Sequence, residues 1–179
     1  TRRVLGVIRP TVEQLGRHTK TGHIGVFGTP GTIQSESYDM EIAKLYPGFK
    51  TVGHACPMWV PLIENGEASS LGADYFVKQE ADRIIDKDDN IDTIILGCTH
   101  YPLLYTKIRK YIPEHISLLK QGEIVASSLA DYLKRHTAME ARLSHNAHTT
   151  YLTTENASKF STMASLFLNN DIEATTVEL

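Results

Sequence analysis

The stretch DTIILGCTHYP, residues 92–102, decides the fold of this chain. Its apolar, β-branched middle predicts a buried strand over residues 92–96. Gly97 lets the backbone turn, or approach a ligand closely, where that strand ends. Pro102 favours the first turn of a following helix. Strand, turn and helix in this order are the repeating unit of an α/β fold with a largely parallel sheet.

The same alternation of short strands and longer helices runs along the rest of the chain. Near-continuous apolar strands fit a sheet that is covered on both faces. We therefore expect an α/β fold of the doubly wound kind with a mainly parallel sheet, and a surface loop over 135–148. Further strands are expected at 24–27, 49–53, 149–153 and 175–179, and helices at 32–45, 58–64, 71–86, 102–111, 124–134 and 156–168.

Composition narrows the class of protein. The chain has 179 residues, a formal net charge of −3, 41% hydrophobic and 22% charged residues, and two cysteines. These values are typical of a globular protein without a disulfide scaffold. The negative net charge shows no excess of the basic residues that nucleic-acid binding requires. The apolar runs are too short to span a bilayer. Without a visible signal peptide, we expect a cytoplasmic protein with neither a nucleic-acid nor a membrane partner.

Ligands of open α/β sheets bind outside the carboxyl ends of the strands. That rule selects the three turns at 28–32, 54–57 and 97–101. In the last of them, Cys98 is expected at the rim of the sheet near a helix N-terminus, whose partial positive charge favours thiolate over thiol. The free amides there can hold a ligand carboxylate, and His100 can supply a proton. The alternative is that Cys98 is a small buried hydrophobe.

The turn at 54–57 offers a second cysteine. Pro57 follows Cys56 at once and apolar residues crowd behind it, so we expect Cys56 to be a packed, structural thiol. Glu64 ends the apolar helical run that follows. It is either a solvated helix end or a functional carboxylate.

The turn at 28–32 offers hydroxyl groups at a helix start. The absence of a GK[ST] sequence excludes a Walker-type phosphate loop. Thr32 is expected to be the N-cap of the helix. Together with Thr29 it is also a candidate contact for a ligand carboxylate or ammonium.

Two other functions stay open on residue types alone. One is a thiol hydrolase or transferase in which Cys98 attacks and His100 assists. The other is a zinc-stabilised binding module that uses His54, Cys56, Cys98 and His100, although structural zinc sites usually show CxxC spacing.

Several motifs resemble those of the glutamate racemases, over nearly the whole chain. The sequence LGCTHYPLL at 96–104 resembles the C-terminal cysteine motif of that family. The sequences ACP at 55–57 and VPLIE at 60–64 resemble its middle motif. Weaker likenesses are the threonine-rich turn (Gly28, Thr29, Thr32, Ser35 and Tyr38), the approach at 4–8, and the closing segments at 151–154 and 177–179.

The resemblance implies a cofactor-independent enzyme that interconverts L- and D-glutamate and supplies D-glutamate for peptidoglycan. No metal and no cofactor are expected. Two thiols flank the α-carbon in that family: one removes the α-proton and the other donates a proton to the opposite face. By motif, Cys98 is one of them and faces L-glutamate, and His100 and Glu64 match residues that assist proton transfer. Thr99 and Thr32 match substrate contacts, with Thr29 beside them, whereas Cys56 does not match the second thiol.

The sequence also departs from the family pattern. It contains no Asp-Ser-Gly, Pro-Tyr-Gly or Cys-Asn-Thr, the N-terminal motifs that would supply the partner cysteine and further substrate contacts. We therefore expect a fragment with negligible racemase activity by itself. On the family pattern, residues 1–120 form the second domain and 121–179 an incomplete return segment of the first. Its uncovered apolar faces predict a homodimer.

Overall fold

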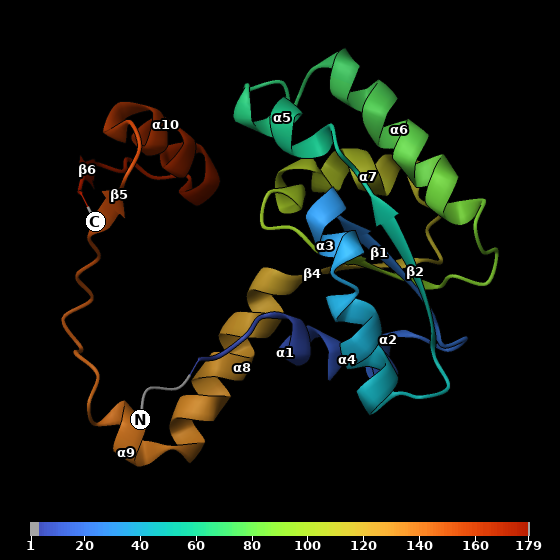
Figure 1. Ribbon diagram of the computed structural model, residues 1–179, viewed down its shortest axis with the longest axis horizontal. Helices are drawn as coiled ribbons and strands as arrows, with labels where there is room; N and C mark the ends of the chain where they lie inside the picture. The colour runs from blue at the N-terminus through green and yellow to red at the C-terminus, as the bar shows by residue number, and fades with distance from the viewer. Residues whose placement is uncertain (1–3, 179) are drawn as a thin grey trace. The chain divides into compact units, whose positions relative to one another are not determined.

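The computed structural model describes residues 4–178, and these form two compact units that divide between Arg135 and His136. The first unit holds a four-stranded sheet in the order β2-β1-β3-β4 (Figure 1). The strands are β1 (His23–Gly28), β2 (Lys50–Ala55), β3 (Thr93–Leu96) and β4 (Ser117–Lys120). Every neighbouring pair is parallel, which confirms the expected sheet.

Helices cover both faces of this sheet, as a doubly wound fold requires. On one face a core of buried side chains joins the strands to α1 (Ile8–Val12), α2 (Leu15–His18) and α4 (Ser37–Leu45). On the other face lie α5 (Trp59–Glu64), α6 (Leu71–Ile85), the 3₁₀ helix η1 (Tyr101–Leu104) and α7 (Tyr105–Tyr111). There Trp59 packs between Phe27 of the inner strand β1 and Tyr101, with ring centroids 4.8 Å from each.

The helix expected over 32–45 is two helices instead. Helix α3 (Pro30–Gln34) ends early, and Glu36 takes a left-handed backbone conformation with φ 49° before α4 begins. The apolar spacing of the sequence continues across this break, because both helices present apolar residues to the same core. Periodicity alone therefore did not reveal the break.

The short elements α1, α2 and β4 were not predicted either. The two helices have five and four residues, which is too short for a periodic pattern to register. Strand β4 has four residues at an edge of the sheet, and only Leu119 in it is buried. The remaining elements expected in this unit are confirmed to within a few residues at their ends.

The second unit is a small β-α-β arrangement. Strands β5 (Tyr151–Thr153) and β6 (Ala174–Thr176) pair in parallel, and α10 (Ala157–Leu168) connects them. The side chain of Asn156 caps α10 by accepting a hydrogen bond from the backbone N–H of Lys159 at 2.9 Å. The loop expected over 135–148 contains the short helix α9 (Thr137–Glu140). The last residue of the strand expected at 175–179, Leu179, lies outside the described residues.

Helix α8 (Gln121–Arg135) groups with the first unit, because it follows β4 directly and contacts α1. The compact units of the structure thus divide at residue 135. The expected assignment of 1–120 and 121–179 to two domains of a longer protein remains a prediction.

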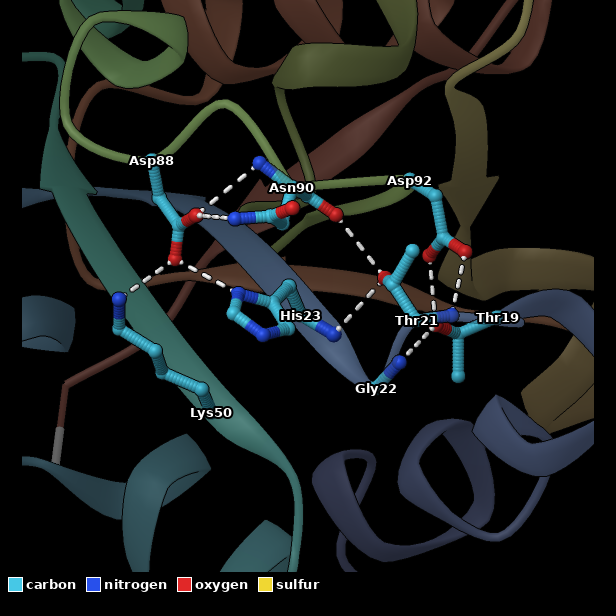
Figure 2. A network of polar contacts seen from close by, with 8 residues as sticks. All are labelled: Thr19, Thr21, Gly22, His23, Lys50, Asp88, Asn90 and Asp92. Carbon is cyan, nitrogen blue, oxygen red and sulfur yellow. Dashed lines mark hydrogen bonds and ion pairs between the residues drawn. The ribbon is translucent and has the colours of Figure 1, made fainter.

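A dense polar network holds the amino ends of the strands (Figure 2). The carboxylate of Asp88 accepts from Nδ1 of His23 and pairs with Nζ of Lys50, both at 2.8 Å. The carboxylate of Asp92 accepts from the hydroxyl of Thr19 at 2.5 Å and from the backbone N–H groups of Lys20 and Thr21 at 2.7 and 2.9 Å. These contacts join β1, β2 and β3 at the amino end of the sheet.

Candidate functional site

The three turns selected from the sequence meet at the carboxyl edge of the sheet. Strand β1 lies between β2 and β3, and its last residues pair with the ends of both. The backbone N–H of Cys56 donates to the carbonyl of Gly28 at 2.9 Å, and the N–H of Gly97 donates to the carbonyl of Phe27 at 2.8 Å. The turns at 28–32, 54–57 and 97–101 are therefore adjacent, as the rule for parallel sheets predicted.

Gly97 occupies a position where the backbone leaves no room for a side chain. A Cβ atom at this residue would lie 2.9 Å from the carbonyl oxygen of Phe27 and 3.2 Å from the ring of Tyr38. The glycine thus allows the chain to turn tightly over β1 and present Cys98 at the rim, which agrees with the close approach inferred from the sequence.

Cys98 is half-buried and lines a cavity of about 350 Å³. Burial raises the pKa of the Cys98 thiol, while the backbone N–H groups of His100 and Tyr101 act in the opposite direction. The net direction is upward, so the expected preference for thiolate is wrong for this state of the protein. The N–H groups of the following turn are present as predicted, but loss of hydration outweighs them.

His100 lies between the thiol and a carboxylate. Its Nδ1 is 3.8 Å from the sulfur of Cys98 and 3.4 Å from the hydroxyl of Thr99. Its Nε2 is 3.2 Å from Oε1 of Glu64, at the end of α5. The structure thus brings four of the candidate residues together, and a proton can pass from one side of the imidazole ring to the other.

The two threonines of the first turn lie at the start of α3. Their hydroxyl oxygens are 2.9 Å apart, and Thr29 is the N-cap, accepting from the backbone N–H of Thr32 at 3.3 Å. The N-cap role expected for Thr32 is therefore wrong, because Pro30 starts the helix one turn earlier. Both hydroxyl groups remain at the carboxyl edge of the sheet, next to β1.

Cys56 is a packed thiol, as expected. It is 1% exposed, and its sulfur lies 3.8 Å from the carbonyl of His54. Burial raises the pKa of this thiol far above its usual value. The hydroxyl of Tyr101 donates to the Cys56 carbonyl at 3.4 Å, so this turn is tied to the turn that carries Cys98.

Sequence reasoning missed Gln121, which lines the cavity beside Cys98. It is the first residue of α8 and follows β4 directly. The rule that ligands bind at strand ends would have selected it, but that rule was applied only to predicted strands, and β4 was not among them. The other lining residues are Val7, Leu96, Thr99, Pro102, Gly122, Val125 and Ala126.

The zinc alternative finds no support in the geometry. Within residues 4–178, no group of three or more His, Cys, Asp or Glu side chains is placed to hold a metal ion. His54, one of the four residues considered, instead bonds through Nε2 to Oε2 of Glu80 at 2.7 Å.

Every helix in the described part of the chain is too short or too polar to cross a membrane.

A parallel α/β sheet with a half-buried cysteine at its carboxyl edge, next to histidine and glutamate, defines the class of site. The Asp/Glu/Hydantoin racemase family profile matches residues 3–144 of this chain. The match covers well over half of the sequence, and the chain belongs to this family.

Individual relatives agree with the family match. The chain is 37% identical over 176 residues to a glutamate racemase of Persephonella marina and 32% identical over 176 residues to one of Streptococcus uberis. Each match covers 98% of this chain but only 64% and 66% of the relative. The chain thus spans slightly less than two thirds of the length of these relatives.

Solved structures of similar fold carry the same name. Glutamate racemase isoform RacE1 from Bacillus anthracis superposes with a TM-score of 0.88 at 34% identity, covering 100% of this chain and 66% of that protein. Glutamate racemase from Francisella tularensis, solved in complex with D-glutamate, gives a TM-score of 0.80 at 26% identity, covering 97% and 62%.

Proposed function

We propose that this chain forms the Cys98 side of a cytoplasmic glutamate racemase that supplies D-glutamate for peptidoglycan. The single observation that carries the proposal is the arrangement at the carboxyl edge: Cys98 opens onto a cavity and is backed by His100 and Glu64. Membership of the racemase family and the names of the relatives support glutamate as the substrate.

The chemistry requires a proton to leave one face of the α-carbon and another to arrive at the opposite face. Because burial raises its pKa, Cys98 rests as a thiol and is poised to donate. In the reverse direction its thiolate must form transiently. The imidazole of His100 can then take up the proton, and Glu64 stabilises the imidazolium that results. Thr99, Thr29 and Thr32 offer hydroxyl groups to the substrate carboxylates.

A two-thiol reaction cannot run on Cys98 alone. Cys56 is sealed in the core and cannot reach a substrate, so the counterpart thiol must come from polypeptide outside these 179 residues. We therefore expect no measurable racemization by this chain as it stands. Circular dichroism of L- and D-glutamate at high protein concentration tests this, and turnover well above a Cys98→Ala variant would refute it.

A chimera tests the function itself. The part of the Persephonella marina relative that lies outside the match would be joined to this chain. The chimera should racemize glutamate, and Cys98→Ala should lower its rate by about 10²–10⁴-fold, whereas Cys56→Ala should leave the rate near that of the parent. A chimera that folds cooperatively but is inactive, beside an active natural relative, would overturn the proposal.

A second function deserves one test because Cys98, His100 and Glu64 also form the series that a thiol hydrolase or transferase uses. The raised pKa of Cys98 disfavours it, since a nucleophilic cysteine needs a depressed pKa. Incubation with an activated acyl ester, followed by intact-mass measurement, distinguishes the two. Turnover through an acyl-enzyme would favour the hydrolase, because proton transfer leaves no covalent intermediate.

A further inference from the structure

Gln121 lies beside Cys98, although it does not belong to any of the turns at 28–32, 54–57 and 97–101. It begins α8 at the carboxyl end of β4, the neighbour of the strand that leads to Cys98. Both side chains line the same cavity of about 350 Å³. The two residues thus face a common space from adjacent strand ends.

A directed chain of hydrogen bonds fixes the orientation of the Gln121 amide. The hydroxyl of Thr11 donates its hydrogen to the carbonyl of Val7 at 3.2 Å. Its oxygen is then an acceptor, and it receives the amide Nε2 of Gln121 at 3.0 Å. Nε2 is therefore on the side of Thr11, and Oε1 must point the other way.

Tyr38 fixes the other half of the amide. Its hydroxyl donates to Oε1 of Gln121 at 2.9 Å. Tyr38 is buried, and burial raises the pKa of its phenol to about 12, so it stays a donor at neutral pH. The ring of Tyr38 also packs against Gly97. The same side chain thus contacts both the turn that presents Cys98 and the amide of Gln121.

The cavity needs such a donor if it is to hold an anion. The residues that line it are neutral, and most are apolar. A carboxylate buried there requires hydrogen bonds to replace its lost hydration. An amide nitrogen carries two N–H groups, and the bond to Thr11 uses only one of them. The second is available to a ligand, at a position that the two anchors hold fixed.

We propose that Gln121 is a substrate-binding residue of this site, whose anchored carboxamide donates a hydrogen bond to a carboxylate of glutamate beside Cys98. The assignment rests on the proposed function, because it takes glutamate as the ligand. Tyr38 and Thr11 are positioning residues, since they act on the substrate through Gln121. Preorientation matters because an amide that is already fixed loses little freedom when the ligand binds.

Alkylation of Cys98 by iodoacetamide, followed by peptide mass spectrometry, reports occupancy of the cavity without requiring turnover. D-Glutamate and L-glutamate should each slow the alkylation of the wild-type chain. Gln121→Met keeps the size of the side chain and removes the donor, so it should weaken the apparent affinity about tenfold, the value of one hydrogen bond to a charged group. Gln121→Glu should weaken it further, because it places two carboxylates together.

Tyr38→Phe tests the anchoring separately. It removes a hydroxyl that does not line the cavity, so a several-fold loss of affinity is expected. Tyr46→Phe is the matched control, because Tyr46 also carries a hydrogen-bonded hydroxyl but contacts Gly16 and Glu13 rather than Gln121. Thermal unfolding and the ligand-free alkylation rate of each variant show whether a change in affinity merely follows a loss of structure.

The outcomes separate the two proposals. If glutamate protects the wild type and protects Gln121→Met equally well, the role of Gln121 is refuted and the proposed function stands. If glutamate fails to protect the wild type at any concentration, the Cys98 cavity is not a glutamate site and both proposals fall. Weaker protection of Gln121→Met, with unchanged stability and unchanged ligand-free alkylation, supports both.

Discussion

The amino and carboxyl ends of the parallel sheet differ in how closely their polar side chains contact one another. At the amino end, the carboxylates of Asp88 and Asp92 hold contacts of 2.5–2.9 Å to His23, Lys50, Thr19 and the backbone N–H groups of Lys20 and Thr21 (Figure 2). Asn90 and Thr93 add further hydrogen bonds of 3.0–3.3 Å to the same carboxylates. At the carboxyl end, the distances from His100 to Cys98, Thr99 and Glu64 are 3.2–3.8 Å, and the thiol opens onto a cavity.

The difference teaches where the protein is rigid and where it can do chemistry. Carboxylates whose hydrogen-bonding capacity is filled stabilise one conformation and leave no group to offer to a ligand. Where the contacts are longer and lie beside a cavity, a bound substrate can add hydrogen bonds to the same polar groups. The amino end should therefore govern stability and the carboxyl end reactivity, and the following four predictions test that division.

The largest effect is expected from Asp92→Ala at the amino end. It leaves two backbone N–H groups and the Thr19 hydroxyl without their acceptor, which should lower the free energy of unfolding by about 3 kcal/mol. Urea unfolding measures the change. Asp89→Ala, at an exposed position in the same loop, is the control and should stay near wild type. Equal losses in both variants would break the comparison.

The two cysteines should differ in alkylation rate by about a hundredfold, which corresponds to an opening that costs roughly 3 kcal/mol. Cys98 is half-buried at the rim, whereas Cys56 is sealed in the core. Peptide mass spectrometry after timed iodoacetamide treatment measures both rates in one sample. In denaturant the two rates should converge. Comparable rates in the folded protein would contradict the assignment of Cys56 to the core.

Acid should weaken the amino end of the sheet. Ion pairs with Lys50 and His23 hold the pKa of Asp88 well below its usual range. For Asp92, burial raises the pKa, but the hydrogen bonds from Thr19, Lys20 and Thr21 prevail and lower it to about 2. Because both folded pKa values lie below the unfolded value near 4, the stabilisation is present above that pH and is lost as the pH falls toward 2.

Urea unfolding at a series of pH values between neutrality and pH 2 checks this window. Protonated Asp92 can still accept some of its hydrogen bonds, so the loss should be smaller than in Asp92→Ala. That variant should also lose less stability on acidification than the wild type. A variant as sensitive to acid as the wild type would show that other carboxylates control the acid limb.

The smallest effect is expected from Glu64→Gln at the carboxyl end. The charge of Glu64 contributes to raising the pKa of Cys98, after the larger effect of burial. Its removal should lower that pKa slightly and speed alkylation of Cys98 about two- to threefold near neutral pH. Glu67→Gln, in the exposed turn after α5, serves as the control. A slower reaction in Glu64→Gln would show instead that Glu64 aids deprotonation of Cys98 by stabilising the imidazolium of His100.

The sequence by itself determined the α/β fold and the location of the site. Apolar runs followed by glycine-containing turns sufficed to predict β1 and β3, because buried parallel strands have no polar face to blur the pattern. The edge strand β2 is mostly half-buried, and it was predicted only to within two residues at its C-terminal end. The motif around Cys98, Thr99 and His100 indicated both the chemistry and the family. The packing of Cys56 followed from the apolar residues that come after it.

Only the tertiary structure decided the features that depend on distant segments. Neither the pKa direction of Cys98 nor the N-cap of α3 could be predicted, because burial and the start of a helix depend on neighbours that local pattern does not contain. Gln121 enters the site because β4 joins the edge of the sheet beside β3. Its orientation depends on Tyr38 and Thr11, which lie 83 and 110 residues away in the chain. Such contacts exist only once the sheet has brought these segments together.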